Sequence, residues 1–196
     1  MQREAMFPPR PTVLAQQILA GLLRKGDCVI DATAGNGHDT QFLAECVGTS
    51  GSVLAFDVQP AAIAAARARI EQAGFSGSVE FILESHEWMG KHARENSIAA
   101  VMFNLGYLPG EDHGRTTETT VTLAALAVAA GVLKQMGGML SVICYPGHPA
   151  GATEAAAVEG WMEQQAAKGW RVAKYGAIHT RRPAPFLCFA RTGDNR

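Results

Sequence analysis

Short apolar stretches rich in β-branched residues alternate along this chain with longer stretches in which apolar positions recur at helical spacing. The short stretches are typical of buried strands, and the longer ones of helices that cover a sheet. Strands are predicted at 29–31, 53–58, 79–83, 98–103, 139–145, 170–178 and 185–191, and helices at 11–24, 38–47, 61–71, 116–136 and 152–168. This alternation predicts an α/β fold with a doubly wound, mostly parallel seven-stranded sheet that ends in an antiparallel C-terminal edge hairpin.

The chain of 196 residues is expected to form a single domain, 1–196, in which 1–10 is an N-terminal arm. Hydrophobic residues make up 47% and charged residues 18% of the chain, a composition that argues against disorder. The net charge of −1 gives no strong basic field, so an RNA substrate would need a local basic patch. The sequence has no apolar run of membrane-spanning length and no signal-peptide pattern, which predicts a cytoplasmic protein without a membrane partner.

Residues 29–40 combine the end of a strand, a glycine turn and the start of a helix. Gly35 and Gly37 flank Asn36, and polar residues follow. Glycine permits a tight turn and lets backbone N–H groups approach a ligand, and a helix N-terminus leaves further N–H donors free. The stretch therefore predicts a nucleotide-type cofactor site at the carboxyl end of the first strand.

Two cofactors compete for this site. A dinucleotide fingerprint needs a third glycine, but Thr40 stands at that position. S-adenosylmethionine has an ammonium and a sulfonium group and no diphosphate, so the carboxylate of Asp31 ahead of the glycines suits it better. Asp57, after the second strand, suits the ribose of either cofactor. We therefore favour S-adenosylmethionine, with a nicotinamide-dependent oxidoreductase and a turn without a ligand as the alternatives.

Polar residues follow or end five of the predicted strands: Asp31, Asp57, Ser85, Asn104 and Tyr145. In doubly wound sheets, ligands bind beyond the carboxyl ends of the parallel strands. These five residues are therefore expected to gather along one edge of the sheet and to form a single active site.

The segment 104–110 resembles the catalytic loop of amino-group methyltransferases, in which Asn or Asp often precedes two prolines and an aromatic residue. The side-chain oxygen of Asn104 and the carbonyl of Leu105 would accept two N–H bonds from an amine and aim its lone pair at the methyl group. Tyr107 would stack on a flat base. Leu105 and Gly106 depart from the two prolines, and a glycine–proline turn with a packed tyrosine remains the alternative.

Six segments together resemble the YtqB-like class I methyltransferases, a family also labelled rRNA methylases, in the same order over nearly the whole chain. These segments are 31–40, 56–59, 85–87, 104–110, 145–149 and 185–187. The resemblance implies a Rossmann-like methyltransferase fold and S-adenosylmethionine as the cofactor. It also implies a role in tRNA modification, in which the 5-aminomethyl group of a wobble uridine in the anticodon loop is methylated. An rRNA or another amine is the alternative substrate, and a cofactor-binding module without catalysis is a further alternative.

The expected site residues fall into three groups. The cofactor contacts are expected from Asp31, Thr33, Gly35, Asn36, Gly37, His38, Asp39, Thr40, Asp57, Gln59, Ser85, His86 and Asn104. The catalytic residues are expected to be Asn104, Tyr107, Asp112 and His113, and either Asp112 or His113 would assist removal of the amine proton. The substrate contacts are expected from Tyr107, Arg115, Tyr145, His148, Arg181 and Arg182, because the planar fork of arginine suits phosphate.

No metal is expected, because the histidines lack the H-x-x-x-H spacing and the cysteines lack the C-x-x-C spacing of common metal sites. The family suggests a homodimer. The loop residues Glu111, Gly114 and Arg115 differ from the usual family pattern and bear on the choice of substrate more than on the cofactor.

Overall fold

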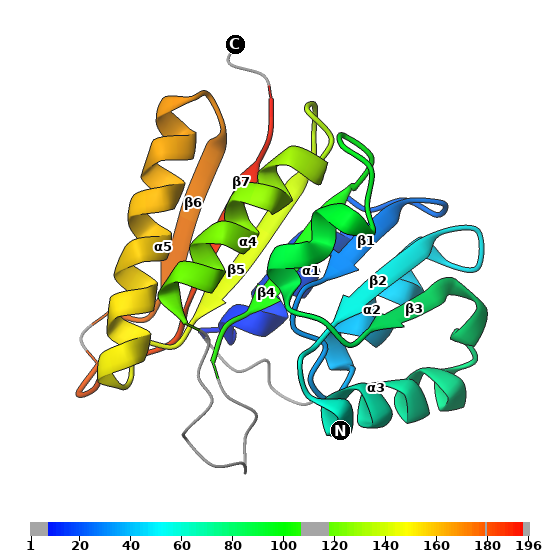
Figure 1. Cartoon of the computed structure of the whole chain (residues 1–196). Helices are drawn as coiled ribbons and strands as arrows, with labels where there is room; N and C mark the ends of the chain where they lie inside the picture. The colour runs from blue at the N-terminus through cyan, green and yellow to red at the C-terminus, as the bar shows by residue number, and fades with distance from the viewer. Residues whose placement is uncertain (1–7, 107–117, 179, 194–196) are drawn as a thin grey trace.

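The computed structural model describes residues 8–106, 118–178 and 180–193 (Figure 1). Seven strands form one sheet in the order β3-β2-β1-β4-β5-β7-β6. They are β1 (Cys28–Asp31), β2 (Ser52–Phe56), β3 (Val79–Ile82), β4 (Ala100–Asn104), β5 (Met139–Cys144), β6 (Arg171–Gly176) and β7 (Phe186–Arg191). The first five strands are parallel to one another, and β7 is antiparallel to both β5 and β6. The predicted fold class, with its C-terminal edge hairpin, is therefore confirmed.

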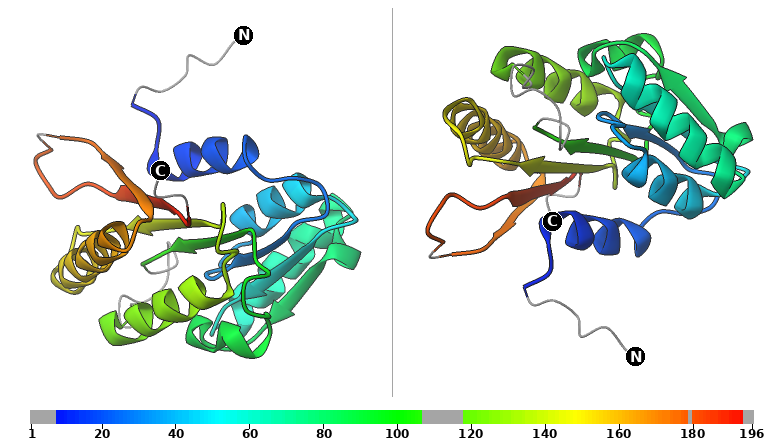
Figure 2. Two further views of the ribbon diagram at one scale, coloured as in Figure 1. Left: turned by 90° about the horizontal axis from the view of Figure 1, so that it is seen from above. Right: turned by 90° about the horizontal axis from the view of Figure 1, so that it is seen from below.

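Helices cover both faces of this sheet (Figure 2). They are α1 (Pro11–Ala20), α2 (His38–Val47), α3 (Pro60–Ala73), α4 (Thr119–Val132) and α5 (Pro149–Ala167), with the short 3-10 helices η1 (Ser76–Ser78) and η2 (His86–Lys91). Successive strand residues point to opposite faces, so Val29 packs in the core beneath α1 and α2, and Ile30 packs in the core beneath α4 and α5.

The helix boundaries follow local sequence rules. Proline occupies the first position of α1, α3 and α5, where its missing N–H group costs nothing. Gly74 ends α3 in the left-handed conformation, and its N–H group donates to the carbonyls of Ile70 and Glu71. These signals explain why the alanine-rich segment after Pro60 forms a regular helix.

Two predicted boundaries near α4 and β4 are wrong. Within the described residues, the helix expected over 116–136 ends at Val132, and the strand expected from residue 98 begins at Ala100. Ile98 and Leu133 pair in an isolated parallel bridge outside the named strands. The backbone of Leu133 is extended to make this bridge and leaves the helix. The helix expected over 11–24 also ends earlier, at Ala20.

Within the described ranges, no helix combines the length and the apolarity that a bilayer crossing requires.

Candidate active site

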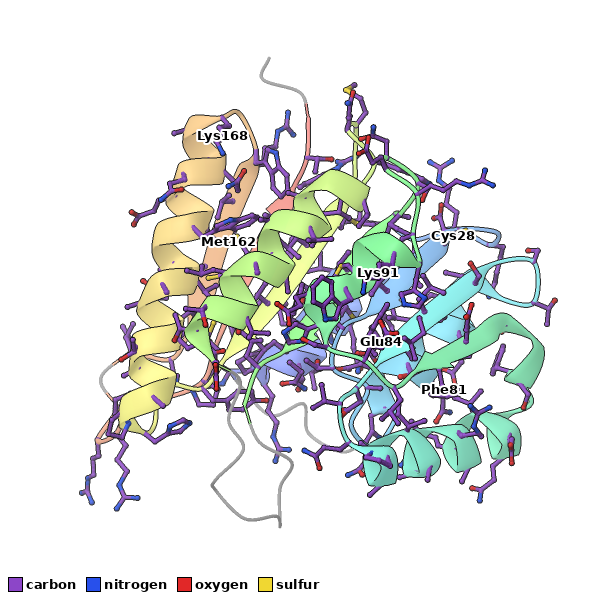
Figure 3. The ribbon with its side chains drawn as sticks, viewed as in Figure 1. Cys28, Phe81, Glu84, Lys91, Met162 and Lys168 are labelled. Carbon is purple, nitrogen blue, oxygen red and sulfur yellow. The ribbon has the colours of Figure 1, made fainter. Side chains whose placement is uncertain are left out.

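The carboxyl ends of the parallel strands lie together along one edge of the sheet (Figure 1). The backbone N–H of Asn104, at the end of β4, donates to Thr33 Oγ1 at 2.8 Å. The hydroxyl of Tyr145, just after β5, donates to Asn104 Oδ1 at 2.8 Å. Cys28, at the amino end of β1, lies at the opposite edge (Figure 3). The predicted convergence at the ends of β1, β4 and β5 is therefore present.

The glycine turn lies between β1 and α2. Gly35 and Gly37 both have positive φ angles, 49° and 77°. A Cβ atom on Gly37 would lie 2.7 Å from the Cα of Ala66 in α3, so only glycine fits there without movement of the backbone. Gly37 also occupies the N-cap of α2, which has no side-chain cap. The turn therefore presents uncapped N–H donors beside the strand ends.

Asp57 fixes this turn to the end of β2. Its Oδ2 accepts the N–H of Gly35 at 2.9 Å, and its Oδ1 accepts the N–H of Gln59 at 2.9 Å. Each carboxylate oxygen retains a lone pair for a further donor, such as a ribose hydroxyl. The apolar side chains of Val58 and Leu83 beside it are 59% and 52% exposed. This part of the edge combines a hydrogen-bond acceptor with bare apolar surface.

The surroundings of this apolar surface are visible in Figure 3, where Phe81 of β3 and Glu84 lie on the side of the molecule that carries α3. The guanidinium of Arg67 lies 5.0 Å from the centre of the Phe81 ring. Ser85, the residue after Glu84, occupies the N-cap position of η2, and its side chain makes no capping hydrogen bond there. Its hydroxyl therefore has no structural task at this helix end.

Asp31 is almost completely buried, with 1% of its surface exposed. Its Oδ2 accepts the hydroxyl of Thr40 at 2.6 Å, and its Oδ1 accepts the N–H of Thr33 at 3.1 Å. Burial, and secondly the charge of Asp39, raise the pKa of Asp31 to about 7. Asp31 therefore stabilises the glycine turn through its hydrogen bonds to Thr33 and Thr40. A direct contact of Asp31 with an ammonium group stays a prediction, and the burial of Asp31 does not favour it.

Asp39, in the first turn of α2, accepts hydrogen bonds from two other side chains. Its Oδ1 accepts Nε2 of Gln16 at 2.8 Å, and its Oδ2 accepts Nδ2 of Asn104 at 3.5 Å. Asp39 is 9% exposed. The expected contact of Asp39 with the cofactor stays a prediction, and the low exposure of Asp39 does not favour it.

Two of the expected histidine contacts differ in their surroundings. His38 is exposed, and its Nε2 lies 3.2 Å from Arg69. His86 is buried, and its Nδ1 lies 3.0 Å from the carbonyl oxygen of Ala32. Burial lowers the pKa of His86 and so favours the neutral ring. Its Nε2 is buried and has no partner among the described residues.

Sequence reasoning missed Arg69 and Gln16. Arg69 donates from Nε to the carbonyl oxygen of Asn36 at 2.8 Å, so α3 holds the exposed tip of the glycine turn. A basic residue in an alanine-rich helix gives no signal of this contact, because the partner is a backbone carbonyl far away in the sequence. Gln16 is missed for the same reason, since its partner lies on another helix.

The expected substrate residues are only partly described. Tyr107, Asp112, His113 and Arg115 lie outside the described residues, and so do the departures at Glu111 and Gly114. His148 caps α5, where its Nδ1 accepts the N–H of Gly151 at 3.0 Å.

The arginines Arg181 and Arg182 lie exposed between β6 and β7. They make no hydrogen bond or ion pair with the rest of the chain that the structure describes. Across the same described ranges, no group of three His, Cys, Asp or Glu residues could hold a metal ion.

Comparison with known proteins identifies the family of this chain. The protein family described as "Putative rRNA methylase" matches residues 53–191. The chain belongs to this family. The chain is also 36% identical over 196 residues to a protein of Arabidopsis thaliana named tRNA (mnm(5)s(2)U34)-methyltransferase, chloroplastic. That match covers 95% of this chain and 70% of the plant protein.

Solved structures of rRNA methylase-like proteins have the same fold. A "putative rRNA-methylase" from Clostridium thermocellum matches with a TM-score of 0.90 and 32% identity, over 95% of this chain and 99% of that one. A "putative methyltransferase" from Streptococcus mutans, in complex with SAH, matches with a TM-score of 0.80 and 32% identity, over 93% and 97%.

These matches confirm the resemblance, the methyltransferase class and, at the level of the family, the predicted cofactor S-adenosylmethionine. The alternative of a nicotinamide-dependent oxidoreductase receives no support from them.

Proposed function

We propose that this member of the rRNA methylase family uses S-adenosylmethionine to methylate the nitrogen of a 5-aminomethyl group on the wobble uridine of a tRNA. The carboxamide of Asn104 carries the proposal, because it ends β4 beside the glycine turn and is oriented by the hydroxyl of Tyr145. The plant relative, which is named a tRNA (mnm(5)s(2)U34)-methyltransferase, supports this substrate.

The residues at the ends of β2 and β3 fit the adenosine part of the cofactor. Asp57 has lone pairs left for ribose hydroxyls, and the exposed side chains of Val58 and Leu83 offer an apolar surface to a flat base. The uncapped start of α2 adds N–H donors nearby for the carboxylate of the amino-acid part. The other proposed contacts with the cofactor are Thr33, Asn36, His38, Gln59, Ser85 and His86.

When bound, the cofactor would supply an electrophilic methyl group. The amine nitrogen would bond to the methyl carbon as the carbon–sulfur bond breaks, the sulfur would keep that electron pair, and the amine would lose one proton. Asn104 Oδ1 has two lone pairs, and Tyr145 occupies one of them. The second lone pair and the carbonyl oxygen of Leu105 accept the two amine N–H bonds and aim the nitrogen lone pair. Catalysis by this chain is then mainly positioning, with Asp112 or His113 proposed to accept the proton and Tyr107 to hold the base.

RNA contacts are proposed from Arg115, Arg181, Arg182, Tyr145 and His148. Arg181 and Arg182 support this proposal through their exposure and their lack of partners among the described residues. With a net charge of −1, the protein needs such local cations to hold the anticodon loop. A single domain, action in the cytoplasm, the absence of a metal and a homodimer remain proposals, and the homodimer rests on the family resemblance alone.

A methylation assay tests this function. The protein is incubated with S-adenosylmethionine and either tRNA that carries 5-aminomethyl-uridine or the same tRNA without that modification. Mass spectrometry of the nucleosides is expected to find one added methyl group only on the aminomethyl-uridine. Cells that lack the protein are expected to accumulate the unmethylated nucleoside.

Ribosomal RNA is the second candidate substrate, because the family is described as "Putative rRNA methylase". The same assay with rRNA separates the two substrates. A methyl group that enters rRNA and not the tRNA would contradict the proposal and favour this alternative.

A further inference from the structure

A chain of hydrogen bonds crosses the site and joins four side chains from separate parts of the fold. Gln16 of α1 donates to Asp39 Oδ1 at 2.8 Å. Asn104 of β4 donates from Nδ2 to Asp39 Oδ2 at 3.5 Å, and Tyr145, after β5, donates to Asn104 Oδ1 at 2.8 Å. Asn104, whose carboxamide the proposed reaction uses, lies between Asp39 and Tyr145 in this series of hydrogen bonds.

The side-chain amide of Asn104 lies between a hydrogen-bond acceptor, Asp39, and a donor, Tyr145, and this difference determines the orientation of the amide. A carboxylate such as Asp39 can only accept hydrogen bonds, so it selects the NH₂ group of the amide. If the amide of Asn104 were rotated by half a turn, its oxygen would face the carboxylate of Asp39, and two acceptors would meet. One rotamer is therefore strongly favoured, with Oδ1 turned toward Tyr145.

The Tyr145 hydroxyl is held as a donor on the other side. A tyrosine hydroxyl keeps its proton at physiological pH, and burial, followed by the charge of Asp39, raises the pKa of Tyr145 further above its usual value. Gly106 adopts a φ of 138°, and a Cβ there would lie 3.3 Å from Cδ2 of the Tyr145 ring. The backbone that leaves β4 thus passes close over this ring and restricts its movement.

We infer that Asp39 and Tyr145 are positioning residues that hold the carboxamide of Asn104 in one orientation, with Gln16 holding Asp39. This inference rests on the proposed function. It adds the contacts that keep Oδ1 of Asn104 oriented to accept a hydrogen bond from the amine. It gives Asp39 a different role from the cofactor contact expected from the sequence. A misplaced catalytic amide costs turnover, whereas the affinity for the cofactor is left intact.

The decisive variants are Asp39→Asn and Tyr145→Phe. In Asp39→Asn, residue 39 can donate as well as accept, so both orientations of Asn104 become possible. We expect kcat for the aminomethyl tRNA to fall about tenfold to a hundredfold, while the Kd for S-adenosylhomocysteine changes less than about threefold. Tyr145→Phe removes a single hydrogen bond and is expected to lower kcat about fivefold to tenfold.

Tyr175→Phe is the matched control. The hydroxyl of Tyr175 also donates one hydrogen bond, to the carbonyl oxygen of Pro9 at 2.9 Å, but it lies on β6 and outside this chain of contacts. We expect it to leave kcat and the Kd unchanged. Circular dichroism and thermal melting of each variant identify loss of folding, and Gln16→Met replaces Asp39→Asn if the latter does not fold.

A second readout tests the positioning without any methyl transfer. The side-chain NH₂ signals of Asn104, assigned by their loss in Asn104→Ala, are recorded by ¹H–¹⁵N NMR with S-adenosylhomocysteine bound. We expect one sharp pair that exchanges slowly with water in the unaltered protein and in Tyr175→Phe. The pair is expected to broaden, or to exchange faster, in Asp39→Asn and Tyr145→Phe.

The outcomes separate this inference from the proposed function. A weaker Kd in Asp39→Asn with an unchanged kcat at saturating cofactor would make Asp39 a cofactor contact and overturn the inference. Unchanged NH₂ signals in both variants would also overturn it. If the unaltered protein binds S-adenosylhomocysteine but does not methylate the aminomethyl tRNA, the proposed function fails, and the NMR signals still decide on the positioning.

Discussion

The edge of the sheet that carries the proposed active site has two regions of opposite character. Over β1, β4 and β5, polar side chains bind one another, as in the contacts of Asp31 with Thr40 and of Asn104 with Tyr145. Over β2 and β3, the partners of Asp57 among the described residues are backbone N–H groups, and Val58 is more than half exposed. We call these the ordered region and the open region.

The difference corresponds to two physical tasks. A reacting amine must be aimed to within a fraction of an ångström, which requires side chains whose rotamers are fixed by their neighbours. A nucleoside needs free surface and unused lone pairs, because its binding energy comes from contacts that form on arrival. Substitutions in the ordered region should therefore affect turnover, and substitutions in the open region should affect affinity.

Replacement of Asn104 by alanine is expected to have the largest effect. It removes the amide around which the ordered region is built, so turnover should fall about a hundredfold or more. Calorimetry should find the Kd for S-adenosylhomocysteine within about threefold of its original value. Asn96→Gly, in a turn with a φ of 58° outside both regions, is the control. Equal turnover in Asn104→Ala and the control would refute the assigned role.

Gly37→Ala tests the turn that joins the two regions. The substitution combines a positive φ with a Cβ placed 2.7 Å from the Cα of Ala66, and we expect a loss of about 3 kcal/mol in the free energy of unfolding. Gly74→Ala is the matched control, since its φ of 79° is similar and nothing lies within 4 Å of its Cβ. That variant should lose only about 1 kcal/mol. Urea denaturation measures both, and equal losses would show that close packing at Gly37 is unimportant.

Asp57→Asn tests the open region. An amide can accept only one of the two backbone N–H bonds well, so we expect the Kd for S-adenosylhomocysteine to rise about tenfold. The kcat at saturating cofactor should change little. Asp27→Asn is the control, because Asp27 accepts the N–H of Arg24 at 2.8 Å but precedes β1 at the opposite edge. A large loss of kcat in Asp57→Asn would contradict the division into two regions.

The effect of Asp31→Asn is best seen as a pH dependence of stability. Because the folded pKa of about 7 lies above the ordinary 3.8, the folded state holds this proton more tightly than the unfolded chain. The resulting stabilisation is complete below about pH 4 and is lost as the pH rises to about 7. The variant lacks this titration, so its free energy of unfolding relative to the unaltered protein should increase over that range. Parallel urea-unfolding curves from pH 5 to 8 would contradict the raised pKa.

The sequence alone was sufficient to predict the sheet and the gathering of polar residues at the carboxyl ends of its parallel strands. The β-branched runs and the glycines after Asp31 have local physical causes, and parallel strands bring their carboxyl ends together by topology. The contacts between side chains were not predictable in the same way. Gln16 and Arg69 lie on helices whose orientation is set by packing, and the burial of Asp31 depends on how α2 lies over β1. The sequence singled out Asn104 as a candidate, but it gave no signal of the side-chain contacts of Asn104 with Asp39 and Tyr145.

The position of β7 has a consequence for synthesis of the chain on the ribosome. β7 follows β6 in the sequence but lies between β5 and β6 in the sheet. A nascent chain shorter than 186 residues therefore leaves β5, whose residues are all buried in the finished fold, with an unpaired edge. Such an edge is a template for aggregation, so chaperone binding to ribosome-bound fragments should decline only after β7 has emerged from the exit tunnel.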